Sequence, residues 1–165
     1  MPEKTRKNSS FSSDVQNPLL DEINVQLLEQ LQANPRISMS ELARRAKLSA
    51  PSVTERVQRL EESGVIAGYR LDIDPKALGL PIIAYIRIRP MPGQLTKVAE
   101  LARATPEVVE CHRITGEDCF LLKVYVAQIS ALETILDKFL AFGQTTSSIV
   151  QSSPVPLRPL PLPKN

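Results

Sequence analysis

The chain has 165 residues, of which 42% are hydrophobic and 23% charged, and its formal net charge is +2. This composition is typical of a globular protein, and no run approaches the roughly 18 apolar residues that a membrane-spanning helix needs. Because the N-terminal stretch also lacks the apolar segment of a secretory signal, we expect a cytoplasmic protein.

Three helices are predicted in the first half of the chain. Apolar residues at helical spacing predict the first over about 19–33. Ser38 and Glu41 form a capping box at the start of the second, in which each side chain satisfies a free backbone amide. Ser49 can cap the third, with Pro51 in its first turn, where a missing N–H costs nothing. The residues expected to face their common core are Ile23, Leu27, Leu28, Leu31, Leu42, Ala43, Ala46, Val53, Val57 and Leu60.

A strand-like segment follows the third helix. Gly64 is a candidate left-handed C-cap. Residues 65–73 have strand-like composition with a bend at Gly68, and a turn follows at Asp74 and Pro75. Three helices followed by a two-stranded ribbon make a winged helix-turn-helix. We therefore expect such a domain, with its linker ribbon, over 17–79, behind a flexible polar arm over 1–16.

The second half alternates strands and helices. "PIIAYIRIRP" alternates, which is typical of a strand with one wetter side. Its two faces are Ile82, Ala84, Ile86 and Ile88, and Ile83, Tyr85, Arg87 and Arg89. "EVVECHRI", "CFLLKVYV" and "TTSSIVQS" predict three more strands, and the helical faces between strands are Leu95, Val98, Leu101 and Ala102, then Ile129, Leu132, Ile135, Leu136, Phe139 and Leu140. The order β-α-β-β-α-β is ferredoxin-like, so the chain is predicted to be an α+β two-domain protein with its second domain over 80–153. Both helices cover one face of the sheet, and a homodimer through the other face is the simplest partner for it.

Two cysteines border the predicted hairpin. Antiparallel pairing places Cys111 opposite Leu122 and Cys119 opposite Ile114, so no disulfide is expected, and Cys111 is interpreted as a small buried hydrophobe. Two cysteines and one histidine are too few for a structural zinc site.

The Pro-rich residues 154–165 include five prolines and are expected to be extended. Their spacing suits a polyproline-binding partner. An arm that packs on a neighbouring subunit or stays mobile is the favoured interpretation.

Positive charge gathers around the third helix. Five basic side chains within 44–59 stand against Glu55 alone, which suits contact with a polyanion better than general solubility. An α-helix fits the DNA major groove, where Gln and Arg read adenine and guanine edges. Glu55 either reads a cytosine amino group or pairs with Arg59. A solvated face is the plainer interpretation, but the capped helix and tight turn before it favour DNA. The candidate DNA-binding residues are Arg44, Arg45, Lys47, Ser49, Ser52, Thr54, Glu55, Arg56, Gln58 and Arg59.

The loop "TGED" joins two central strands. The residues alone favour a simple hairpin turn. The loop can also hold a small zwitterion, with Asp118 for the ammonium and backbone N–H groups around Gly116 for the carboxylate. His112 is the only histidine, and no Ser, Cys or carboxylate spacing builds a triad around it, so an enzyme is not expected.

Together these segments resemble the leucine-responsive regulatory protein/AsnC family of transcription regulators, also called feast/famine regulatory proteins. The resemblance covers about residues 19–153 and rests on "LDEINVQLLEQLQANPRISMSELARRAKLSAPSVTERVQRLEESGVIAGYRLDIDPKALG", "VVECHRITGEDCFLLKV" and "GQTTSSIV". It implies a DNA-binding domain joined to an effector-sensing domain of the RAM or ACT type, which dimerises through its sheet and commonly assembles into octamers. Family effectors are mostly amino acids bound between subunits near this loop, which makes Thr115, Gly116, Glu117 and Asp118 candidate effector-binding residues.

The resemblance also singles out the turn before the third helix. Lys47 stands where the family usually has Gly. A left-handed conformation at this position would cost Lys on the order of 1 kcal/mol, which contact of its charge with phosphate would offset.

The expected function is a sequence-specific, homo-oligomeric transcription regulator of the nucleoid. An amino acid would bias its DNA binding or oligomeric state by shifting the population of assemblies. No cofactor is expected besides that effector. The alternative is an effector-independent, nucleoid-type architectural protein, with steep salt dependence and little sequence preference.

Overall fold

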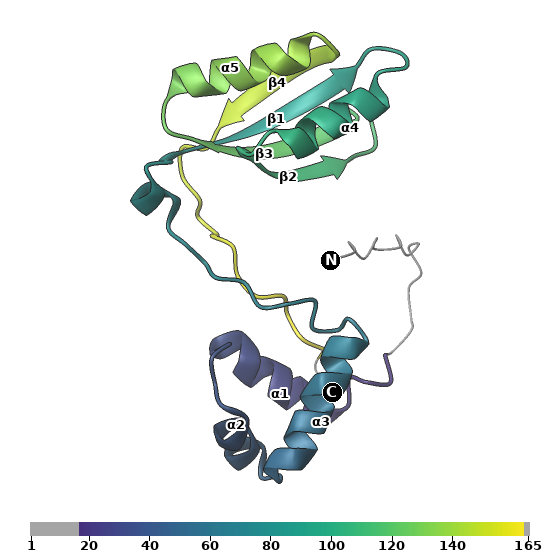
Figure 1. The fold of residues 1–165 in the computed structure, drawn as a ribbon, viewed down its shortest axis with the longest axis vertical. Coiled ribbons are helices and arrows are strands. Elements are labelled where there is room, and N and C mark those ends of the chain that lie inside the picture. Colours follow the sequence, from purple (N-terminus) through teal and green to yellow (C-terminus); the bar gives the residue numbers. More distant parts are fainter. Residues whose placement is uncertain (1–16, 164–165) are drawn as a thin grey trace. The chain divides into compact units, whose positions relative to one another are not determined.

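The computed structural model describes residues 17–163, so the predicted arm over 1–16 lies outside the described residues (Figure 1). The chain divides into two compact units. The helical unit comprises the residues up to Arg70 and those from Leu157, and the sheet unit comprises Leu71–Pro156. Residues 71–79, predicted as the linker of the first domain, therefore group with the sheet unit.

The helical unit contains α1 (Glu22–Ala33), α2 (Met39–Ala46) and α3 (Ala50–Glu62). Each helix begins at a capping side chain, because free amides of the first turn need an acceptor. Asp21, Ser38 and Ser49 supply these acceptors. The predicted inward stripe is confirmed, although Ile23 and Ala46 are only half-buried against it. The buried cluster is formed by Leu27, Leu31, Ile37, Leu42, Ala43, Val53 and Val57, and Leu28 and Leu60 are also buried.

Residues 65–73 differ from the prediction. They form no strand, and they follow α3 as an extended segment that ends at the 3-10 turn η1 (Pro75–Leu78). A strand needs a neighbour for its backbone groups, and none of the strands of the described chain lies beside this segment. Gly64 has φ +79, as predicted for a left-handed C-cap of α3.

The sheet unit has the predicted ferredoxin-like order: β1 (Ile82–Pro90), α4 (Leu95–Ala104), β2 (Val108–Arg113), β3 (Phe120–Val126), α5 (Ile129–Leu140) and β4 (Gly143–Ile149). The strands lie in the order β2-β3-β1-β4, all neighbours antiparallel, and α4 and α5 cover one face (Figure 1). The alternation predicted for β1 is confirmed: Ala84, Ile86 and Ile88 are fully buried, whereas Tyr85 and Arg87 are exposed.

Four residues are more exposed than predicted. Leu95, Ile129 and Leu140 are the end residues of their helices, and they are 38%, 46% and 54% exposed. Cys111 is exposed because β2 is an edge strand that the helices do not fully cover. The predicted register is confirmed: Cys111 pairs with Leu122, and both cysteines are free thiols.

No helix within residues 17–163 combines the length and the apolar character needed to cross a membrane.

Candidate nucleic-acid interface and effector loop

The turn between α2 and α3 is closed by backbone hydrogen bonds. The amide of Leu48 donates to the carbonyl of Ala43 at 3.0 Å, and the amide of Lys47 donates to that of Arg44 at 3.3 Å. Lys47 has φ 55 and ψ 40, a left-handed conformation that favours glycine. A non-glycine residue there costs on the order of 1 kcal/mol. The turn is therefore tight, and it carries the charged side chain of Lys47 at a position whose backbone conformation favours glycine.

The side chain of Ser49 forms a capping hydrogen bond at the start of α3. Its hydroxyl accepts a hydrogen bond from the amide of Ser52 at 3.3 Å, which caps the helix. Pro51 lies in the first turn, as predicted. The side chain of Ser49 therefore sets where α3 begins, and Ser52 is half-buried beside it.

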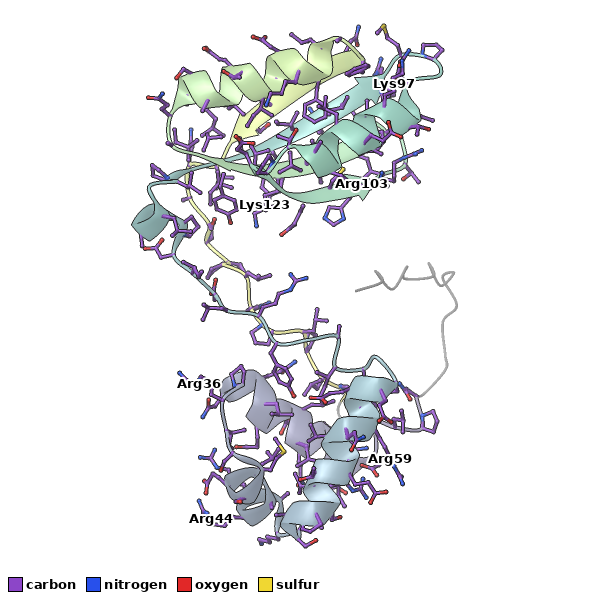
Figure 2. All side chains as sticks on the ribbon, in the orientation of Figure 1. Arg36, Arg44, Arg59, Lys97, Arg103 and Lys123 are labelled. Atoms are coloured by element: carbon purple, nitrogen blue, oxygen red, sulfur yellow. The ribbon has the colours of Figure 1, made fainter. Side chains whose placement is uncertain are left out.

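The exposed side of α3 carries Thr54, Glu55, Gln58 and Arg59, of which Figure 2 labels Arg59. Arg59 pairs with Glu55 one turn earlier, one of the two roles expected for that carboxylate, and both are about 65% exposed. Gln58 donates to Glu62 at 2.8 Å. Thr54 donates its hydroxyl to the carbonyl of Ala50 at 2.9 Å. These exposed partners are replaceable, because surface ion pairs contribute little.

Arg56 has a different position. Its guanidinium donates to the carboxylate of Asp21 at 2.8 Å and to the side-chain oxygen of Asn24 at 3.1 Å. The hydrogen bond from Arg56 lowers the pKa of Asp21, and the Asn24 amide adds to this effect. Because Asp21 caps α1, this contact joins α3 to the start of α1. Arg56 is thus engaged inside the helical unit.

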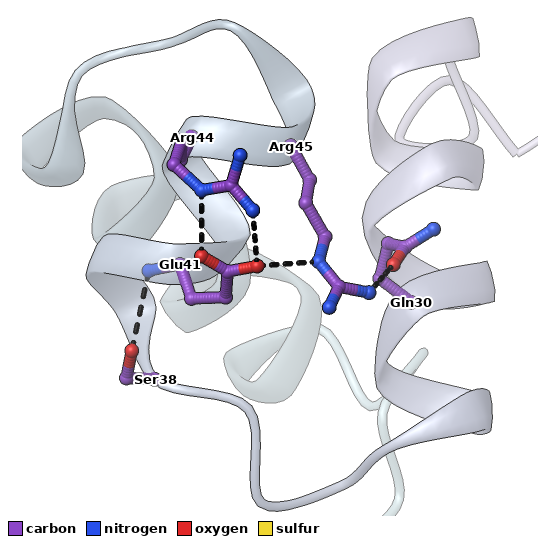
Figure 3. A network of polar contacts seen from close by, with 5 residues as sticks. All are labelled: Gln30, Ser38, Glu41, Arg44 and Arg45. Atoms are coloured by element: carbon purple, nitrogen blue, oxygen red, sulfur yellow. Dashed lines mark hydrogen bonds and ion pairs between the residues drawn. The ribbon is translucent and has the colours of Figure 1, made fainter.

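The α2 arginines share one carboxylate (Figure 3). Glu41 accepts from Arg44 through both oxygens at 2.7 Å and from Arg45 at 2.8 Å, and Arg45 also donates to Gln30 of α1 at 2.7 Å. These hydrogen bonds lower the pKa of Glu41 to about 2, with Arg44 the larger cause. The capping box is therefore only half formed. Ser38 accepts the amide of Glu41 at 3.2 Å, but the Glu41 carboxylate binds arginines instead of returning to the backbone, because charged donors bind it more strongly.

The predicted effector loop follows β2. Gly116 has φ +112, a conformation that favours glycine, so the loop turns there. The amide of Ile114 donates to the carbonyl of Cys119 at 3.0 Å, and the amide of Cys119 donates to that of Ile88 at 2.9 Å. Thr115, Gly116 and Glu117 are exposed at the tip.

Two arginines of β1 lie against this loop and were not among the predicted effector-binding residues. Arg87 pairs with Asp118 at 3.6 Å, and Arg89 forms an ion pair with Glu117. The alternating pattern of β1 could have identified them, because it places both arginines on the wetter side of that strand. The pairing of Ile88 with Phe120, directly after the loop, then places them beside it. Two cations of β1 and two carboxylates of the loop thus lie together, and these charges match both ends of a zwitterion.

Comparisons with known proteins match both units. Residues 20–67 match the family described as winged helix-turn-helix DNA-binding, and residues 83–160 match the Lrp/AsnC ligand binding domain. The HTH-type transcriptional regulator LrpC of Bacillus subtilis (strain 168) is 35% identical over 133 residues, which is 81% of this chain and 92% of LrpC. The structure of B. subtilis LrpC has a TM-score of 0.78 and covers 81% of this chain and 96% of its own.

Two further solved structures contain an amino acid. A transcriptional regulator of Neisseria meningitidis in complex with L-Met is 29% identical with a TM-score of 0.79, and covers 87% of this chain and 97% of its own. A feast or famine regulatory protein of M. tuberculosis complexed with L-methionine is 35% identical with a TM-score of 0.80, and covers 87% and 99%. These names give no support to an effector-independent architectural protein. With both domain matches in chain order, the chain belongs to the Lrp/AsnC family of transcriptional regulators, with a helix-turn-helix DNA-binding domain followed by a ligand-binding domain.

Proposed function

We propose that this regulator binds specific double-stranded DNA sites through α3 and that an amino acid biases this binding. The main observation behind this proposal is the left-handed turn at Lys47 between the two capped helices α2 and α3. This turn leaves one side of α3 exposed for contact with DNA. In this proposal Gln58 and Arg59 contact bases, and Arg44, Arg45 and Lys47 contact phosphates. Ser52, Thr54 and Glu55 contribute at the edges of the same surface, and Ser49 and Arg56 act mainly by holding α3 in place. The site of action is then the nucleoid in the cytoplasm.

The loop Thr115–Asp118 is the proposed effector site. Asp118 would receive the ammonium group, and Arg87 or Arg89 would receive the carboxylate together with amides around Gly116. The existing ion pairs would open and re-form around the ligand. The methionine complexes of the two relatives support an amino acid as the ligand class.

Assembly is the proposed link between the two sites. The face of the sheet away from α4 and α5 presents Tyr85 and, on the edge strand, Val109, which are 38% and 52% exposed. A homodimer through this face, and larger assemblies such as an octamer, would set the spacing of paired recognition helices on DNA. Effector binding would favour one assembly and thereby change which half-sites can be spanned together.

A thermal-shift screen of the twenty amino acids tests the effector part. A ligand that binds the folded state raises the melting temperature, and we expect at least one such shift with the intact protein. The shift should disappear in Asp118→Asn and persist in Asp137→Asn, a matched change on the exposed side of α5. A screen without any shift would refute amino-acid sensing.

Selection from random duplex DNA tests the DNA part. We expect a recurring sequence that the protein binds at least about a thousandfold more tightly than random DNA at physiological salt. Selection that returns no common sequence would refute sequence-specific binding.

A further inference from the structure

The described C-terminal segment, residues 157–163, belongs to the helical unit although it follows the sheet unit in the chain. It contains no helix or strand, and its yellow trace runs to the helical unit in Figure 1. An open groove of about 670 Å³ is lined by α1 and by Pro159–Pro163. We call residues 157–163 the tail; it forms part of the surface of the helical unit.

The tail lines the same groove as an apolar residue of α1. Val25 lies outside the buried cluster that the three helices share, yet it is only 8% exposed and lines the groove together with the tail. Within the described tail, Leu162 is the half-buried side chain, whereas Leu157 and Leu160 are 92% and 79% exposed. Leu162 is therefore the tail side chain that supplies apolar contact.

A polar contact fixes the tail beside α1. The side-chain amide of Gln32 donates to the carbonyl of Leu160 at 3.1 Å. Proline has no N–H, so a proline-rich segment docks through carbonyls and apolar rings instead of through a β-ladder. Charge also favours the contact, because the sequence from 154 onwards contains Arg158 and Lys164 and no acidic residue, while Glu22 and Glu29 line the groove.

A small contact area is sufficient to hold the tail on α1, because the tail is rich in proline and is covalently tethered. A polyproline segment is already extended before it docks, so docking costs less conformational entropy than for an ordinary segment. The tail is also tethered, and a short tether gives an effective concentration on the order of millimolar. A contact too weak to hold a free peptide can thus hold the tail.

We propose that the tail is an intramolecular strap, which docks on the outer side of α1 of its own chain. The strap gives the helical unit a second connection to the sheet unit, through residues 150–156, besides the segment that follows Arg70. Resting on the function proposed above, a change at the end of β4 on effector binding would reach the DNA-binding helices by this second route.

Hydrogen exchange of the full-length protein tests the docking without DNA or effector. In a chain that lacks residues 157–165, and in Leu162→Asp, the amides of α1 should exchange roughly fivefold faster, the effect of losing one half-buried leucine. Leu157→Asp is the matched control, because its side chain is almost fully exposed, and it should leave α1 unchanged. Unchanged α1 exchange after the deletion would overturn the proposal, and so would equal effects of the two aspartate variants.

Cross-linking tests whether the strap belongs to the same chain. With Cys111 and Cys119 replaced by Ser, a short bismaleimide should join Gln32→Cys to Leu160→Cys. A product that migrates as one chain supports the strap, and a product found only as a covalent dimer refutes docking within the chain. Both experiments report on the tail alone, so their failure is distinct from failure of the amino-acid screen.

Discussion

Arg56 of α3 donates a hydrogen bond to Asp21, the capping residue of α1, at 2.8 Å. A residue placed by sequence among the DNA contacts thus joins two helices of its own unit. Asn24, a buried polar residue, accepts from the same guanidinium and donates to the carbonyl of Leu19 at 2.7 Å.

Arg56→Gln should therefore destabilise the helical unit. We expect a loss of about 1 kcal/mol in the free energy of unfolding, because the ion pair is partly solvated and Asn24 loses a donor. Asp21 has a lowered pKa in the folded state, so its contribution is present above about pH 4, the unfolded value, and is lost as the pH falls through the folded value. Denaturation of both proteins between pH 7 and pH 2 measures this. Arg59→Gln is the control, because it removes an exposed ion pair with Glu55. A stability difference between Arg56→Gln and the unchanged protein that stays constant with pH would contradict the role assigned to Asp21.

Arg59→Ala should weaken binding to the selected DNA site by about 1–3 kcal/mol and relax the base preference there, because it removes a base-edge donor. Fluorescence anisotropy with specific and random duplexes measures both effects. Arg36→Ala removes the same charge from an exposed position of the same unit. Equal losses on specific and random DNA would sink the base-reading role.

Glu41→Gln should free two arginines for phosphate contact. The pKa of about 2 means that Glu41 is charged at neutral pH, so the substitution removes a negative charge and weakens its hold on Arg44 and Arg45. We expect tighter non-specific DNA binding. The slope of log affinity against log salt concentration should also become steeper by about one, as for one additional phosphate contact. Glu62→Gln on α3 removes an equal charge that pairs with no arginine within the described residues. If both variants change the slope alike, the Glu41 pairing does not limit DNA contact.

Two substitutions at Lys47 separate backbone strain from charge. Lys47→Gly removes the left-handed strain and should be more stable than Lys47→Ala by about 1 kcal/mol. Both remove the cation and should weaken DNA binding to the same extent. Chemical denaturation and DNA titration of the two variants measure these effects, and equal stabilities would show that the turn relaxes around an alanine.

Gly143→Ala should destabilise the sheet unit by about 1–3 kcal/mol, the usual cost of overpacking. An added Cβ would lie 2.4 Å from the carbonyl oxygen of Arg89 and 2.8 Å from the Cα of Pro90, and backbone cannot move aside as a side chain can. Thermal unfolding measures the loss. The neighbouring exposed Gln144→Ala should change stability little, and a comparable loss there would argue against the steric cause.

Sequence periodicity and capping signals predicted the five α-helices and the four strands of the sheet. Val53, Val57 and Leu60 recur at helical spacing and are buried, and the alternation in β1 predicted which face would be covered. These signals are local, because a helix or strand expresses its pattern within a few residues. The strand predicted over residues 65–73 was wrong, because a β-type composition does not by itself supply the neighbouring strand that its backbone would need.

The sequence by itself therefore determined the order of elements, their inward faces and the family. The tertiary structure decided which polar side chains are engaged: Arg56 with Asp21, Glu41 with two arginines, and Arg87 with Asp118. It also placed the tail on α1. These pairings join residues from different elements or choose among competing local partners, so their geometry depends on how the helices and strands pack and not on spacing along the chain.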